Sequence, residues 1–140
     1  MGASILTSPE RPRLVVPGRP ALAPDVERYV LKAGGTAGFE IDAGDRIEIA
    51  ALEGGQPVEV VAFGARGKSD LGALGLAGRG RPLGIERALA GDSEDAARVR
   101  FGLFRRGLDL GRAKAARLLA PDAGPGELVA LEAERSVFAV

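Results

Sequence analysis

Hydrophobic and polar residues alternate through the middle of this chain, and the alternation predicts β-strands. In residues 46–52 two isoleucines fall on one side and a glutamate on the other, which is the period-two pattern of a strand with one buried face. Residues 58–63 carry apolar side chains on both sides, which predicts a strand that is buried on both faces. The segment between them, residues 53–56, has the composition of a tight turn, so we expect the two strands to form a hairpin.

Further strands are predicted toward both ends of the chain. Short apolar runs favour strands at Phe39–Ile41, Leu128–Ala133 and Val137–Val140, and a brief strand at Leu14–Val16. Residues 26–31 fit either a strand or one helical turn.

Capping residues predict where helices begin. Ser93 can accept a hydrogen bond from the first turn of a helix, and the two residues after it are acidic, which suits the positive end of the helix dipole. Residues 96–106 fit a helix or a strand, and this cap favours the helix. Asp109 can cap a second helix over Leu110–Ala120, and residues 85–90 predict one further helical turn.

Together these elements predict an α+β, β-rich fold: a small barrel or sandwich with one or two helices in the C-terminal half. Five prolines within residues 1–24 prevent regular pairing through most of that segment, so we expect a Pro-rich extended arm there. Residues 25–140 have the length of a single β-rich domain. Because an apolar strand ends the chain, that strand is either central in a sheet or the domain is incomplete at its C-terminus.

Composition excludes several kinds of chemistry. The chain has no Cys and no His, so it has no thiol nucleophile, no thiolate metal site and no imidazole base. Lys and Arg number 19, as do Asp and Glu, and only five Phe and one Tyr are present. A neutral chain with so few aromatic residues is not expected to bind nucleic acid. No spacing of carboxylates matches a calcium loop, so we expect no metal site and no cofactor.

The location of the protein is an expectation from the same sequence. The first residues lack the basic and apolar pattern of a secretory signal. No apolar run approaches the ~18 residues of a membrane-spanning helix. We therefore expect a cytoplasmic protein without membrane contact.

Two arginines in the glycine-rich segment 65–84 are weak candidates for binding an anion. Arg79 and Arg81 flank Gly80, and backbone N–H groups beside guanidinium groups suit a phosphate or carboxylate. The segment lacks the Gly-Lys-Ser/Thr ending of a nucleotide-binding loop, and a flexible surface loop is the commoner role for such a sequence. A basic run over residues 98–117 would form one face if it were helical, and it could contact an acidic partner.

The turns and strands between Val30 and Phe63 resemble a known family. The resemblance rests on glycine turns separated by strands, namely Ala33-Gly34-Gly35, Gly44-Asp45 and Glu53-Gly54-Gly55-Gln56, followed by the strand Val58–Phe63. In this arrangement the segment is similar to the urea-carboxylase-associated family. The later run Arg106–Leu119 resembles a version of that domain found ahead of folate-dependent aminomethyltransferases related to the glycine-cleavage T protein.

The resemblance implies the fold and a possible site, but the chain departs from the family in that site. Where the family has Asp in the turn, this chain has Ala51, and where it has Asn, this chain has Gly55. The polar and cysteine residues that support metal chemistry in some members have no counterpart. Glu53, Gln56 and Glu59 are retained, and they are the candidate catalytic residues if the chain is an enzyme.

Two functions from different classes follow from the resemblance. The first is an accessory, non-catalytic domain or subunit that packs on an aminomethyltransferase-type partner. The second is an enzyme acting on a small urea-like or amidine-like C–N compound. An anion-binding module and a homo-oligomer are further alternatives.

Overall fold

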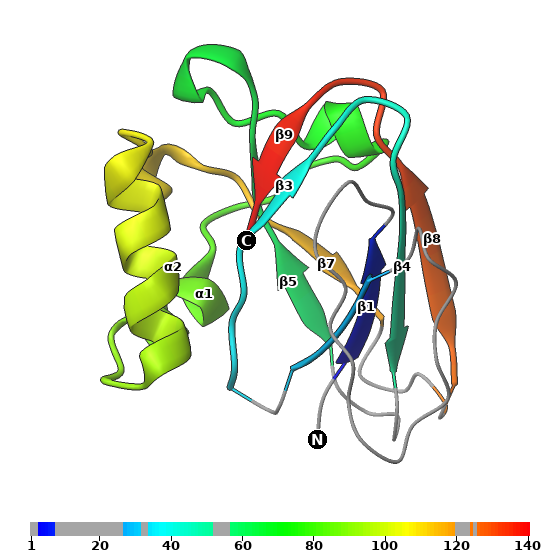
Figure 1. Cartoon of the computed structure of the whole chain (residues 1–140), viewed down its shortest axis with the longest axis horizontal. Coiled ribbons are helices and arrows are strands. Elements are labelled where there is room, and N and C mark those ends of the chain that lie inside the picture. The colour runs from blue at the N-terminus through cyan, green and yellow to red at the C-terminus, as the bar shows by residue number, and fades with distance from the viewer. Residues whose placement is uncertain (1–2, 8–26, 32–33, 52–56, 120–123, 125) are drawn as a thin grey trace.

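A computed structural model of the chain describes residues 3–7, 27–31, 34–51, 57–119, 124 and 126–140 (Figure 1). The β-rich fold with helices in the C-terminal half is confirmed, and the described strands form three small sheets rather than a closed barrel. The strands are β1 (Ala3–Thr7), β2 (Glu27–Leu31), β3 (Phe39–Ile41), β4 (Arg46–Ala51), β5 (Val58–Val60), β6 (Ala62–Phe63), β7 (Ala116–Leu118), β8 (Leu128–Glu132) and β9 (Val137–Ala139). The α-helices are α1 (Leu83–Leu89) and α2 (Glu94–Arg105), and short 3-10 turns are η1 (Ala65–Gly67), η2 (Leu71–Leu74) and η3 (Leu110–Arg112).

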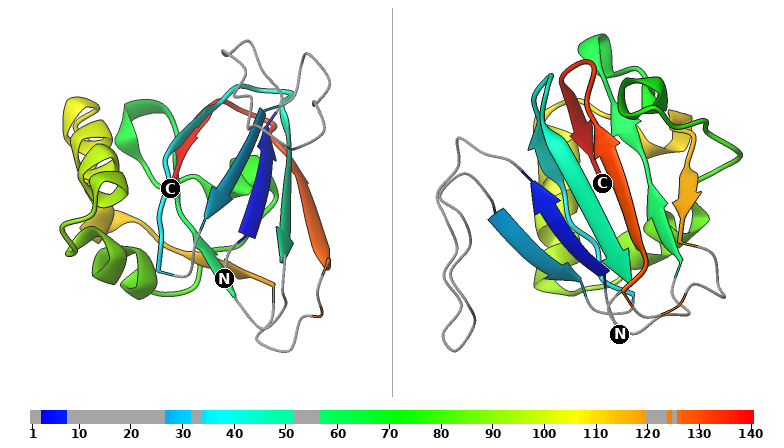
Figure 2. Two further views of the ribbon diagram at one scale, coloured as in Figure 1. Left: turned by 60° about the horizontal axis from the view of Figure 1, so that its bottom comes forward. Right: turned by 90° about the vertical axis from the view of Figure 1, so that its right-hand side faces the viewer.

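The sheets and helices form three layers. The four-stranded sheet has the order β2-β1-β4-β8, and it stands on the opposite side of the molecule from α1 and α2 (Figure 2). Between them lie a three-stranded sheet of order β3-β9-β6 and the two-stranded pair β5-β7. Every described strand pairing is antiparallel.

Residues 58–63 form the wall between two hydrophobic cores. Val60 and Ala62 belong to the core on the side of the four-stranded sheet, whereas Val61 and Phe63 belong to the core under the helices. The predicted burial of both faces is therefore confirmed. The single strand expected here is divided at Val61, whose backbone exchanges two hydrogen bonds with Val140, at 2.9 and 3.0 Å.

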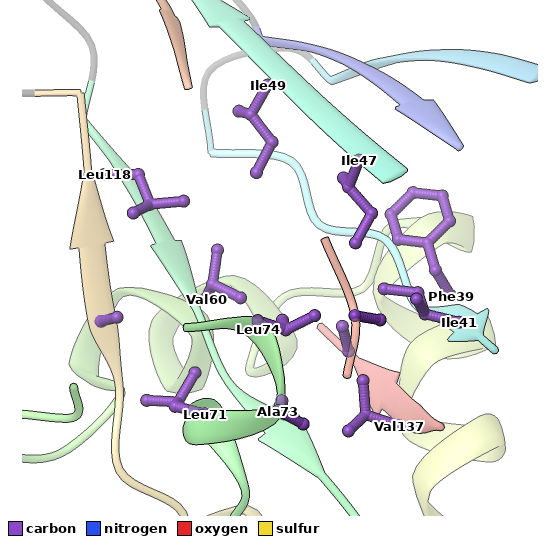
Figure 3. Close-up of a cluster of buried hydrophobic side chains, with 14 of the residues drawn as sticks. Phe39, Ile41, Ile47, Ile49, Val60, Leu71, Ala73, Leu74, Leu118 and Val137 are labelled. Atoms are coloured by element: carbon purple, nitrogen blue, oxygen red, sulfur yellow. The ribbon is translucent and has the colours of Figure 1, made fainter. Parts of the chain in front are cut away.

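The first core lies under the four-stranded sheet. Ile47 and Ile49 of β4 point toward Val60 and Val137 of the middle layer and toward Leu74 of η2 (Figure 3). The expected face of β4 is confirmed, because both isoleucines are buried while the glutamate between them is half-exposed. The glycine-rich segment contributes to this core through Leu71, Ala73 and Leu74 of η2, so it is anchored rather than a free loop.

The expected hairpin between residues 46–52 and 58–63 is wrong. Both edges of β4 are already occupied, by β1 and β8, and β5 pairs with β7 instead. The turn residues themselves, 52–56, lie outside the described residues. The alternation of side chains had fixed which face is buried, and it carries no information about which strand lies alongside.

The second predicted helix is also wrong. Asp109 does cap a turn, because its carboxylate accepts a hydrogen bond from the Gly111 N–H at 2.9 Å, but the turn is the single 3-10 turn η3. The chain then becomes extended and forms β7. In contrast, the cap predicted at Ser93 is confirmed: its hydroxyl accepts from the Ala96 N–H at 3.1 Å, and α2 follows.

The ends of the chain are part of the described sheets. Residues 3–7 form β1, inside the segment expected as an extended arm, and pair with both β2 and β4. The remainder of that arm, with the strand expected at Leu14–Val16, lies outside the described residues. At the other end β9 is the central strand of its sheet, between β3 and β6.

A paired carboxylate and guanidinium fasten two distant turns. Arg135 donates to both carboxylate oxygens of Asp70, at 2.9 and 3.1 Å. These hydrogen bonds lower the pKa of Asp70 below its ordinary value of 3.8. Because folding favours the charged carboxylate, the pair's contribution to stability is present above that ordinary pKa and is lost as the pH falls through the lower pKa of the folded state.

We therefore expect the coupling between Asp70→Asn and Arg135→Ala to depend on pH. A double-mutant cycle by chemical denaturation should give a favourable coupling energy at pH 7 that diminishes as the pH falls below 3.8. The coupling should also weaken in high salt, because both side chains are partly exposed. A coupling energy that stays constant as the pH is lowered would contradict this interpretation.

Candidate functional site

Glu59 is the candidate catalytic residue that the structure describes, and it is engaged with helix α1. It lies on β5 opposite Arg117 of β7. Its carboxylate accepts a hydrogen bond from the Ile85 N–H at 2.8 Å. That N–H is in the first turn of α1, where backbone donors have no partner within the helix, and the residue before the helix, Pro82, supplies no side-chain cap. Glu59 thus caps helix α1 from strand β5.

The sequence around α1 accommodates this carboxylate. A Cβ at Gly84 would lie 3.3 Å from Glu59 Oε1, a closer approach than most side chains tolerate. Glycine at this position allows the carboxylate to sit against the helix end. A structural role is enough to account for a glutamate at position 59, since a negative charge at the start of a helix is stabilising.

The two arginines of the glycine-rich segment lie near the same end of α1. Arg81 forms an ion pair with Glu86, with its Nη2 at 2.9 and 3.1 Å from the two carboxylate oxygens. Arg79 is exposed, and its backbone N–H donates to the Ala115 carbonyl at 2.8 Å, which pairs the segment with the start of β7. Arg81 is therefore already neutralised by a neighbour, which weakens the anion-binding interpretation.

The other retained residues cannot be placed with Glu59. Glu53 and Gln56 lie outside the described residues. Within the part of the chain that the structure describes, no group of three or more Asp or Glu side chains is arranged to hold a metal ion. No helix among the described residues has the length and apolar character needed to cross a membrane.

The basic run over residues 98–117 does not form one helical face. Its first part lies on α2, and its last part lies on β7 and the segment before it. Arg100 is used internally, because its guanidinium donates to the carbonyls of Leu89 and Gly91 at 2.6 and 2.7 Å and joins α1 to α2. Arg106 stacks over the Phe138 ring at 4.1 Å and pairs with Glu40.

An exposed aromatic surface on α2 escaped the sequence interpretation. Phe101 is 61% exposed and Phe104 is 82% exposed, in a chain that has only five Phe. The helical period could have predicted this exposure, because it places Ala96, Val99 and Leu103 on the buried face and leaves both phenylalanines off it. Residues 96–106 fit either a helix or a strand, and the helical period applies to them only once they are known to form a helix.

We expect Glu59→Ala to destabilise the protein by about 1 kcal/mol through loss of the cap on α1. Glu59→Gln should retain most of that stability, because its amide oxygen can still accept from Ile85 N–H. Urea denaturation of both variants measures the difference. Equal losses in the two variants would show that the charge, rather than the hydrogen bond, supports the helix.

Comparison with known proteins places the chain beside part of a large enzyme. It is 34% identical over 132 residues to trimethylamine-oxide aldolase of Ruegeria pomeroyi. The match covers 94% of this chain but 17% of that protein, so the chain spans less than a fifth of the length of its curated relative. No protein-family profile matches the chain, and no solved structure matches it.

Proposed function

We propose that this chain is an accessory, non-catalytic domain or subunit of the urea-carboxylase-associated type, which packs on a folate-dependent aminomethyltransferase-type partner. The observation that carries the proposal is the asymmetry of the match to the aldolase. Nearly all of this chain corresponds to a small share of a long enzyme. A segment with that relation to an enzyme is suited to act as one component of a larger body.

The contacts of the described residues favour a non-catalytic role. The one placed candidate, Glu59, is occupied as a helix cap, and Arg81 is occupied by Glu86. The chain has no His and no Cys to supply a base near neutral pH or a thiolate ligand. A partner would therefore contribute the reacting groups.

Co-purification tests this role. The full chain, with an affinity tag, is co-expressed with a full-length aminomethyltransferase-type protein. We expect the two proteins to elute together in a constant ratio after affinity and size-exclusion steps. A chain that elutes alone, as a stable monomer, contradicts the proposal.

A second candidate function is an enzyme that acts on a small C–N compound. The name of the similar protein, trimethylamine-oxide aldolase, favours it, because that name describes chemistry on a small nitrogen compound. Glu53, Gln56 and Glu59 would then lie in the site. Ammonia release from urea or guanidine derivatives that vanishes in Glu59→Ala, but persists in a variant of another ion pair such as Arg135→Ala, would establish this alternative.

A further inference from the structure

The outer face of α2 carries apolar side chains that the fold itself does not use. Around the helix, Ala96, Val99 and Leu103 point into the core under the helices. Phe101 and Phe104 lie on the opposite side, where a helix of a soluble domain ordinarily presents polar residues. Figure 1 shows α2 at the edge of the molecule, so no other described element covers that face.

The exposure of these two rings is unusual for this chain. Its other aromatic side chains with described burial are Phe39 and Phe63, which are buried, and Phe138, which is half-buried. Isolated surface leucines are common, but two phenylalanines one helical turn apart form a contiguous patch. Aromatic residues are enriched at the centres of protein interfaces, where they fill pockets in the partner.

Charges around the patch indicate the chemistry of the surface that it would meet. The Arg105 guanidinium lies 6.0 Å from the centroid of the Phe101 ring. Arg98 is 76% exposed at its side chain, and it is 3.9 Å from Glu94 and 3.8 Å from Asp95, which are loose ion pairs. Arg98 is thus already paired with two carboxylates, and Arg105 is the cation at the border of the aromatic patch, which suits an apolar pocket with a carboxylate at its edge.

The outer face of α2 is small for an interface between two separate molecules that has no other contact. Helix α2 has 12 residues and is roughly 18 Å long, so its outer face offers on the order of a few hundred Å². A stable dimer buries about 800 Å² on each partner. A face of this size suits a contact that further contacts supplement, as between one segment and the rest of a single long enzyme such as the relative.

We infer that the outer face of α2, centred on Phe101 and Phe104, is the surface through which this chain docks on the body of its larger enzyme partner. The inference rests on the proposed accessory function, and it identifies the contact. The pair of rings fills an apolar pocket of that body, while Arg105 meets a carboxylate at its edge. The relative's length supports this occupant, because most of that enzyme lies outside the segment that matches this chain.

Isothermal titration tests the surface. The full chain is titrated into the full-length aminomethyltransferase-type protein with which it co-purifies, at low and at high salt. We expect Phe101→Ser together with Phe104→Ser to weaken binding by about tenfold or more. Arg105→Glu should weaken binding most at low salt, because a cationic border becomes repulsive toward carboxylates.

The matched control is Leu128→Ser, which removes another exposed apolar side chain, 53% exposed, on β8 at the far side of the molecule. Its affinity should stay within about twofold of the parent, on the expectation that surface changes outside an interface have small effects. Circular dichroism and thermal melting of every variant show that each remains folded. Arg105→Glu alone keeps the test available if the double variant melts early.

The outcomes separate the surface from the function. If the parent chain does not bind, the accessory function is overturned, and the docking surface with it. If the parent binds and the double variant binds equally well, the surface is wrong while the accessory function stands. If light scattering shows a dimer that the double variant dissociates, the occupant is a second copy, which also overturns the inference.

Discussion

Leu103→Ala should lower the free energy of unfolding by about 2–5 kcal/mol, because it removes a buried side chain from the core under the helices. Leu103 is 6% exposed and packs in the cluster that also contains Val61, Phe63 and Ile85. The cavity would lie between α2 and the middle layer, which is made of the strands of both small sheets. The expected loss is therefore global, and chemical denaturation should show one cooperative transition at lower denaturant.

Phe104→Ala, at the adjacent position of the same helix, is the control. Its side chain is 82% exposed, so its removal should change stability by no more than about 0.5 kcal/mol. Alanine is also the better helix former. If Phe104→Ala destabilised the protein as strongly as Leu103→Ala, the aromatic patch would be part of the fold and could not be reserved for a partner.

Gly38→Val should destabilise the protein by about 1–3 kcal/mol through overpacking. A Cβ at position 38 would lie 2.7 Å from Phe138 Cζ, which is closer than real Cβ atoms approach, so the ring or the backbone must shift. Arg106 stacks on the ring at 4.1 Å, and Phe138 is held in register opposite Glu40 by the pairing of β9 with β3. The clash therefore falls on the central strand of its sheet.

A matched glycine and a second-site change test that mechanism. Among the described residues, no atom lies within 4 Å of a Cβ at Gly124, so Gly124→Val should have a small effect. The double variant Gly38→Val/Phe138→Ala should lose less stability than the sum of the losses in the two single variants, because alanine leaves room for the valine side chain. Additive effects of the two changes, measured by denaturation, would show that the ring is not what valine meets.

The sequence predicted the faces of the elements better than their partners. Residues 58–63 were expected to be buried on both sides, and they separate two cores because apolar side chains alternate between both faces. The alternation of apolar and polar residues along a strand depends on which face is buried, so a period of two predicts that face. Pairing depends on contacts far apart in the chain, so the expected hairpin failed where β1 occupied an edge of β4.

The failure at residues 110–120 has a related cause. Helical spacing and a capping Asp109 were both present, and the cap does form. The extended conformation that follows gives β5 its partner strand, and it places Arg117 opposite Glu59 across the pair. Strand pairing with β5 and burial of Ala116 and Leu118 outweigh a weak local preference for helix.

The candidate site shows the same limit. Family resemblance could select Glu59, but it could not show that the carboxylate faces the end of α1, because that contact joins residues 26 positions apart. The aromatic patch required only the helical period once α2 was established. Composition had already identified what the chain lacks, since the absence of His and Cys is read directly from the sequence.

Turnover by the isolated chain tests its non-catalytic role most directly. The purified full chain is incubated with trimethylamine oxide and, separately, with urea, and substrate consumption is followed by nuclear magnetic resonance. We predict no consumption above that of a buffer control for the parent, and therefore no difference between the parent and Glu59→Gln. Consumption of either compound by the parent above the buffer control would contradict the accessory role, and its loss in a folded Glu59→Gln variant would assign that activity to Glu59.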